Sequence, residues 1–114
     1  MEPQADALYL SSRTGEEIYI SYDSISSINL VNTFDFGFPK EGADDKQIRC
    51  GLWENEALGC YQLFTLKNVS DYLVLTTESG TVVFNYESTS VTDSIYSSLR
   101  ELLSEKGLAG QITF

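Results

Sequence analysis

The spacing of apolar residues changes once along this chain, and that change limits the folds open to it. From residue 7 to residue 86, apolar residues recur at every second position in short stretches separated by turn-forming residues, which is the period of half-buried β-strands. Beyond residue 90 the apolar positions follow the period of a helix: Val91, Ile95, Leu99, Leu102 and Leu103. The sequence therefore predicts a mainly β domain that ends in one amphipathic helix.

Seven strands are expected before the helix, because each apolar stretch is bounded by glycine, asparagine, aspartate or serine. In the second stretch Ile18 and Ile20 point to one face and Tyr19, which lies between them, points to the other, so we expect the Tyr19 side chain to be half exposed. The predicted strands are Ala7–Arg13, Glu17–Tyr22, a third around Ile28–Val31, Gln47–Gly51, Cys60–Leu66, Tyr72–Thr77 and Thr81–Tyr86. A turn at residues 14–16 would join the first two.

The terminal helix is predicted to run from Val91 to Lys106. Ser90 is the residue expected to cap its first turn, and Asp93 is expected to accept hydrogen bonds from first-turn amides. A cation and a glycine at positions 106 and 107 suit the other end. These signals place one helix at the end of the chain.

Two segments are predicted to be loops. Residues 34–45 hold one proline, two glycines and two adjacent aspartates, so we expect a long loop with an extended start. Residues 52–59 are expected to join two strands, and Gly51 and Gly59 would let the backbone adopt conformations closed to other residues. Both loops carry large aromatic side chains.

These aromatic side chains are the candidate partner-binding residues of the sequence: Phe34, Phe36, Phe38 and Trp53. Large aromatic residues in loops commonly anchor a protein partner. The alternative is that they fold over an open end of the sheet and complete the core, since exposed apolar patches are uncommon on monomers. Both interpretations stay open at the level of the sequence.

Charge and length narrow the classes of partner. The chain has 114 residues, which fits one domain, and its formal net charge is −10. Nucleic acids and anionic lipids attract clustered cations, whereas the few lysines and arginines here are scattered, so neither is expected as a partner. No apolar run approaches the roughly 20 residues of a membrane span, and the first residues lack the pattern of a signal peptide.

Catalytic chemistry is not expected. The chain has no histidine, so Ser-His and Cys-His pairs cannot form, and the glycines do not follow a phosphate-binding pattern. Glu41, Asp44 and Asp45 lack the spacing of a calcium loop and are predicted to be a solvated acidic segment. No cofactor or metal is predicted. Cys50 and Cys60 either approach each other across a hairpin and form a disulfide or pack as free thiols.

The segments Arg49-Cys50-Gly51 and Leu58-Gly59-Cys60-Tyr61, followed by two strands and a closing helix, resemble bacterial pleckstrin-homology (PH) domains. The resemblance covers about residues 7–106 of a single domain. It implies seven antiparallel strands in two near-orthogonal sheets, capped by the C-terminal helix. It also implies a non-catalytic module for protein–protein interaction or self-assembly, or alternatively one that binds a ligand or a lipid head group at a membrane surface.

One departure concerns the first hairpin, where lipid-binding PH domains carry clustered cations. Here residues 11–17 hold one arginine beside two glutamates, so phosphoinositide binding is not expected. The resemblance is also compatible with a soluble part of a membrane-anchored parent. The expected location is therefore the cytoplasm, for a free chain or for such a cytoplasmic part.

Overall fold

The computed structural model describes residues 2–3, 7–11, 17–44, 46–86, 88–105 and 107. These residues form a mainly β structure with one C-terminal α-helix, as the spacing of apolar residues predicts. The elements are β1 (Glu2–Pro3), β2 (Ala7–Ser11), β3 (Glu17–Ser21), the 3-10 turn η1 (Tyr22–Ser24), β4 (Ile25–Val31), β5 (Phe38–Asp44), β6 (Ile48–Asn55), β7 (Gly59–Leu66), β8 (Tyr72–Thr77), β9 (Gly80–Phe84) and α1 (Thr89–Glu105). The predicted turn at 14–16 and the predicted helix end at Lys106 lie outside the described residues.

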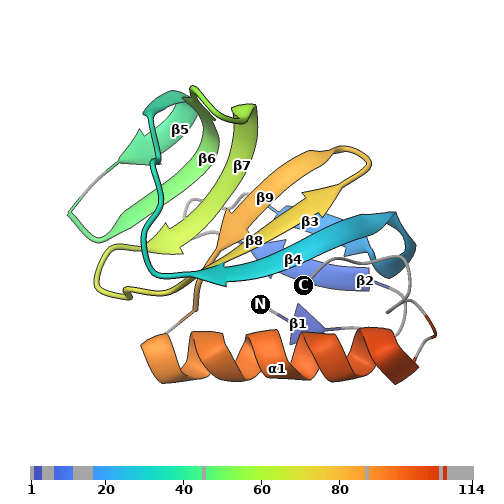
Figure 1. The fold of residues 1–114 in the computed structure, drawn as a ribbon. Helices are drawn as coiled ribbons and strands as arrows, with labels where there is room; N and C mark the ends of the chain where they lie inside the picture. The colour runs from blue at the N-terminus through green and yellow to red at the C-terminus, as the bar shows by residue number, and fades with distance from the viewer. Residues whose placement is uncertain are drawn as a thin grey trace.

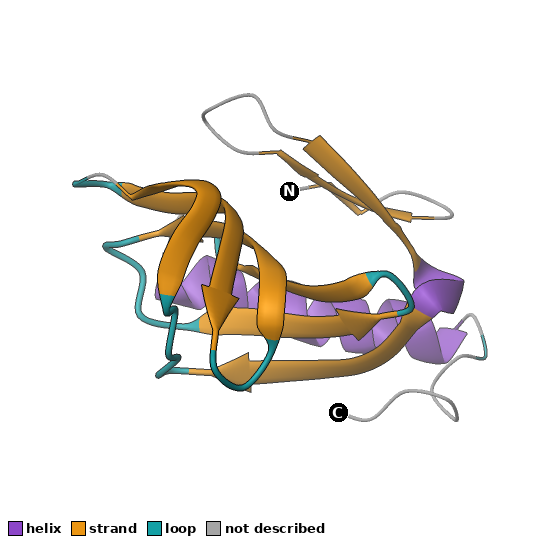
Figure 2. Ribbon diagram, turned by 90° about the horizontal axis from the view of Figure 1, so that it is seen from above, coloured by secondary structure: helices purple, strands orange, loops and turns teal. Residues whose placement is uncertain are grey.

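The strands form two sheets. The smaller has the order β1-β2-β3 and the larger the order β4-β8-β9-β7-β6-β5. In Figure 1, β4, β8 and β9 lie across α1, whereas β5, β6 and β7 rise away from the helix at the other end of the sheet. Figure 2 shows the small sheet beside the large one, joined to it through η1.

One pair of strands corrects the prediction that all strands are antiparallel. β7 and β9 run parallel, with Gln62 opposite Val82 and Phe64 opposite Phe84. The parallel pair arises because β8, after leaving β7, forms on the far side of β9, and the β8–β9 hairpin then returns the chain to a place beside β7. Such a pairing joins segments distant in sequence, so local patterns do not report it.

Two predicted loops are strands instead. The segment expected to be a long loop contains β5, which pairs with β6 from Phe38 to Asp44. A proline is tolerated there because β5 is an edge strand and Pro39 lies at a shift in register. β6 continues past Gly51, which has φ +92°, as far as Asn55. Only residues 56–58 remain as the turn of the β6–β7 hairpin.

The large sheet buries a different cluster of side chains on each face. The helix-side core is mostly aliphatic and joins β3, β4, β7, β8, β9 and α1: Ile20, Tyr22, Ile25, Ile28, Phe64, Leu73, Leu75, Val82, Phe84, Leu99 and Leu103. The aromatic core lies on the other face: Trp53, Tyr61, Leu63 and Val83. Consecutive residues of β7 and β9 contribute to opposite clusters, as the strand period requires.

The start of α1 differs from the predicted cap. Ser88, not Ser90, provides it: the Ser88 hydroxyl accepts a hydrogen bond from the Val91 amide at 3.2 Å. The buried Thr92 hydroxyl joins the segment after β9 to the helix, because it accepts a hydrogen bond from the Tyr86 amide at 3.1 Å and donates to the Ser88 carbonyl at 2.8 Å. The Asp93 oxygen Oδ1 has no hydrogen-bond partner among the described residues, which contradicts its predicted role at the first-turn amides.

Candidate interaction surface

The four aromatic residues predicted to bind a partner differ in how far they are buried. Trp53 lies in β6 and is 2% exposed, so its side chain belongs to the interior. Phe34 and Phe36 lie in the segment between β4 and β5 and are half-buried against the aromatic core. Phe38 begins β5 and is 51% exposed. Of the four, Phe38 therefore presents the most surface to solvent.

The structure brings three of the four side chains together with two tyrosines. The Phe36 ring centroid lies 5.3 Å from that of Tyr72 and 6.4 Å from that of Trp53, both edge to face. Phe34 lies 5.7 Å from Tyr61 in the same manner. Edge-to-face pairs at these distances stabilise a cluster beyond the area it buries. The aromatic segment thus covers one face of the sheet. Phe34, Phe36 and Trp53 therefore complete a core, which is one of the two interpretations that the sequence left open.

Backbone contacts hold residues 34–37 in place over this core. The Tyr61 hydroxyl donates to the Phe36 carbonyl at 2.7 Å, and the side-chain amide of Asn55 donates to the Asp35 carbonyl at 2.7 Å. At Gly37, φ is +72°, and a Cβ atom there would lie 1.9 Å from the carbonyl oxygen of Glu54. Only glycine fits this close approach. We name residues 34–37 the aromatic cover.

Charged groups reinforce the aromatic cover. The Arg49 guanidinium lies over the Phe36 ring, 4.5 Å from its centroid. Burial, together with the nearby charge of Asp35, raises the pKa of the Tyr61 hydroxyl, and the charge of Arg49 lowers it by less. The hydroxyl therefore keeps its proton at neutral pH and remains a donor to the Phe36 carbonyl. The cover is a fixed part of the fold.

Trp53 reaches across to β5, where a glycine makes room for it. The indole Nε1 donates to the Cys50 carbonyl at 3.0 Å. A Cβ atom at Gly42 would lie 2.7 Å from this nitrogen, so the indole occupies the space that a side chain at position 42 would need. Gly42 pairs with Gly51 across β5 and β6. The Trp53 indole therefore packs against the backbone of the edge strand β5 at Gly42.

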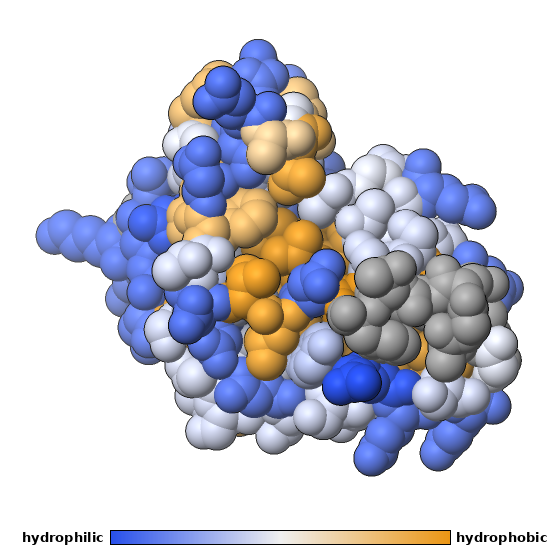
Figure 3. Space-filling model, in the orientation of Figure 1, coloured by the Kyte–Doolittle hydropathy of each residue, from blue (hydrophilic) through white to orange (hydrophobic). Residues whose placement is uncertain are grey.

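Phe38 belongs to a different surface. Lys40 lies 6.0 Å from the centroid of the Phe38 ring and 3.9 Å from the Glu54 carboxylate. Among the described residues, the other large apolar side chains that are more than a third exposed are Tyr19 and Leu58. Tyr19, which was predicted to be half exposed, is 62% exposed. Figure 3 shows an apolar surface between the β5–β7 end of the sheet and α1, bordered by hydrophilic residues.

Other groups predicted from the sequence do not form a site. Cys50 is buried and Cys60 exposed, and both are free thiols. Cys50 pairs with Phe64 and Cys60 with Glu54, so the two cysteines are not opposite each other in the hairpin. The predicted acidic loop is partly strand β5: Asp44 forms an ion pair with Lys67 at 2.5 Å, and Asp45 lies outside the described residues.

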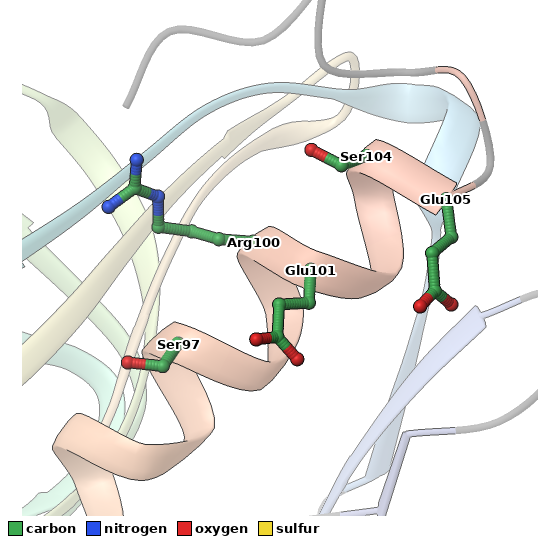
Figure 4. Close-up of a pocket in the computed structure, with 5 residues that line it drawn as sticks. All are labelled: Ser97, Arg100, Glu101, Ser104 and Glu105. Atoms are coloured by element: carbon green, nitrogen blue, oxygen red, sulfur yellow. The ribbon is translucent and has the colours of Figure 1, made fainter.

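One hollow of the described surface, of about 530 Å³, is lined by residues of α1 alone: Ser97, Arg100, Glu101, Ser104 and Glu105. Figure 4 shows Arg100 on one side of the helix and Glu105 on the other, so their charged ends do not converge. In the described ranges no group of three or more histidine, cysteine, aspartate or glutamate residues could hold a metal ion.

Sequence patterns did not identify the two edges of the large sheet. Among the described residues β4 pairs only with β8, and β5 only with β6. An edge strand presents backbone donors and acceptors that another strand can pair with. The longest run of residues without a charge, Ser24 to Phe34, could have drawn attention to β4, but its edge position depends on the distant pairing with β8.

Comparison of this chain with protein-family models, with curated proteins and with solved structures finds no match. No α-helix in the described ranges is long and apolar enough to cross a membrane. The candidate surface must therefore be interpreted from its own chemistry.

Proposed function

We propose that this chain is a non-catalytic module that binds an extended protein segment along an edge of its large sheet. The observation that carries the proposal is the presence of two edge strands, each with one described neighbour. Main-chain hydrogen bonds at such an edge supply affinity for a strand, and alternate side chains supply specificity. The occupant is either another protein or a second copy of the chain.

The arrangement of charge favours a protein occupant over an anionic ligand or a lipid surface. Three of the described cations already have partners: Arg49 lies over Phe36, Lys67 pairs with Asp44, and Lys40 lies near Glu54. A clustered set of free cations is what a phosphate group requires. The resemblance to PH domains, with two near-orthogonal sheets, and a cytoplasmic location remain predictions that accompany this proposal.

A peptide-binding experiment tests the proposal. The chain is immobilised and exposed to a library of short synthetic peptides that includes overlapping segments of its own sequence. We expect retained peptides to lose binding when alternate backbone amides are N-methylated, because strand addition uses those amides. Hydrogen exchange should show the protection at β4 or β5. If neither a peptide nor a second copy of the chain binds an edge, or if N-methylation has no effect on the peptides that bind, edge binding is wrong.

A further inference from the structure

The two edges of the large sheet differ in how they are protected from strand pairing. β5 carries Pro39, which has no amide proton to donate, and the charged residues Lys40 and Glu41. The register between β5 and β6 also shifts between Pro39 and Glu41. Proline, charge and irregular register are the features by which natural edge strands avoid pairing with other chains. β5 is therefore a protected edge.

β4 has little of this protection. Its residues, Ile25–Val31, include neither proline nor a charged residue, and they lie within the longest uncharged run of the chain. The register shift between β4 and β8 is confined to its start, between Ile25 and Ser27, so Ile28 to Val31 pair with β8 without interruption. A regular, uncharged edge strand is a template for a further strand.

The side chains of β4 also suit an added strand. Ile28 is fully buried in the helix-side core, whereas Leu30 packs against the same core but is only half-buried. Asn29 lies between them on the opposite face of the strand and is exposed. A new strand with apolar residues on the core face would extend the helix-side core over Leu30 and would leave the other face polar.

We propose that β4 pairs with β4 of a second copy of this chain, antiparallel and about a two-fold axis. This inference rests on the proposed function and names its occupant. An antiparallel register centred on Asn29 sets Ile28 of one copy opposite Leu30 of the other, so apolar residues meet on the core face. Asn29 then lies opposite Asn29 of the second copy on the exposed face. Such self-complementarity is what a two-fold interface requires.

The lack of charged residues in β4 favours a second copy over a basic peptide at this edge. Each copy carries −10, so two copies repel each other wherever their acidic surfaces meet. The uncharged β4 edge is the part of the chain where they meet without like charges in the paired strands. A basic peptide would find no carboxylate in β4 with which to pair.

The same charges make the dimer depend on salt in a diagnostic direction. Asp23 precedes β4 and Asp35 follows it, so antiparallel pairing of the two β4 strands brings the acidic flank of one copy toward that of the other. Repulsion between surface charges is largely screened beyond about 8 Å at physiological ionic strength. Salt should therefore strengthen the dimer, whereas it would weaken the complex of this acidic chain with a basic partner.

The test is a charge swap at the centre of the proposed interface. Residues directly opposite in antiparallel strands interact strongly enough for like charges to oppose pairing. We expect the full chain to dimerise in light scattering and sedimentation, more at high salt than at low salt. Asn29→Lys and Asn29→Asp should each weaken the dimer several-fold, and an equimolar mixture of the two should restore pairing as a heterodimer.

Ala57→Lys is the matched control, because it adds the same charge in the exposed β6–β7 turn. It should leave the dimer intact or strengthen it, since the net charge falls in magnitude. Circular dichroism checks that all variants fold. A chain that is monomeric at every concentration and salt overturns the inference, as does a mixture that fails to pair. So does a monomer that dimerises only after deletion of residues 108–114, since those residues would then be the occupant.

The two experiments fail independently. If the chain is monomeric but retains peptides through their backbone amides, the proposed function stands and the second copy is the wrong occupant. If the dimer forms and hydrogen exchange places it at β4, with no other peptide bound, the inference stands and the module serves self-assembly alone. If neither a peptide nor a second copy binds an edge, the proposed function itself is wrong.

Discussion

The two faces of the large sheet are covered in different ways. The helix-side core is covered by a 17-residue helix and by β3, and contact between aliphatic side chains holds these layers together. The aromatic core is covered by four residues, 34–37, whose backbone carbonyls are bound by side chains from β6 and β7. A short segment has little area to bury, so hydrogen bonds and aromatic contacts position it instead. The aromatic segment, which resembles a binding site in the sequence, therefore serves mainly to cover the core.

The largest test of this comparison is Trp53→Ala. Removing a buried indole should destabilise the chain by about 3–5 kcal/mol, because a cavity opens beneath Phe36 and beside Gly42. The free energy of unfolding from urea titration measures the loss. Phe38→Ala is the control and should change it by no more than about 0.5 kcal/mol, as exposed positions generally do. Equal losses of unfolding free energy at both positions would mean that Trp53 contributes no more to stability than an exposed residue does.

A smaller test addresses the bond that holds the cover. Tyr61→Phe removes the donor to the Phe36 carbonyl and should cost about 0.5–1.5 kcal/mol in the same titration. Tyr72→Phe removes a hydroxyl from the same cluster, one that forms no hydrogen bond with the described residues, and should cost less. If the two variants lose the same stability, burial alone positions residues 34–37 and the contrast between the two faces disappears.

The smallest effect is expected at the helix side, where α1 begins beside the start of β8. The hydroxyls of Ser70 and Thr89 lie 3.1 Å apart there, and the carboxyls of Asp71 and Asp93 are neighbours. The hydrogen bond that protonated Asp93 donates to Asp71, then desolvation and the negative charge of Asp71, raise the pKa of Asp93. The folded chain therefore binds the Asp93 proton more tightly than the unfolded chain does. When both Asp71 and Asp93 are ionised, their repulsion opposes folding. This destabilisation disappears as pH falls through the raised pKa of Asp93.

Asp93→Asn should consequently increase stability at neutral pH, and the gain should shrink as pH is lowered. Thermal unfolding at a series of pH values measures it. Glu101→Gln removes the same charge from an exposed position on α1 and controls for the net charge of −10. Matching gains for both variants, at all pH values, would assign the effect to overall repulsion and not to the carboxyl pair.

Local features of the sequence predicted what depends on local patterns. β8 has the predicted bounds, Tyr72–Thr77, and the helix lies within two residues of its predicted start, because both have a clear apolar period. β5 was predicted to be a loop because Pro39 and Gly42 disfavour a central strand, yet an edge beside β6 accepts both. Trp53 was placed in a loop because Gly51 was interpreted as the end of a strand.

The candidate surface was predictable in part. The aromatic residues were recognised, but whether they cover a core or bind a partner depends on distant contacts, such as that of Phe34 with Tyr61. The importance of β4 depends on which strand lies beside it, and no local pattern encodes that β8 is its one described neighbour. The uncharged run of β4 was visible in the sequence; its place at the edge of the sheet was not.

The parallel pairing of β7 with β9 also has a consequence for folding. It joins a β5–β6–β7 block to a β4–β8–β9 block through three residue pairs, Gln62–Phe64 with Val82–Phe84. The β6–β7 and β8–β9 hairpins close short loops, whereas this seam must close a longer one, so we expect it to form after both hairpins. Leu63, Phe64, Val83 and Phe84 send side chains into both cores from this seam. These backbone contacts bring the two cores together, and pulsed hydrogen exchange during refolding should show the amides of β7 that face β9 protected later than the amides of the two hairpins.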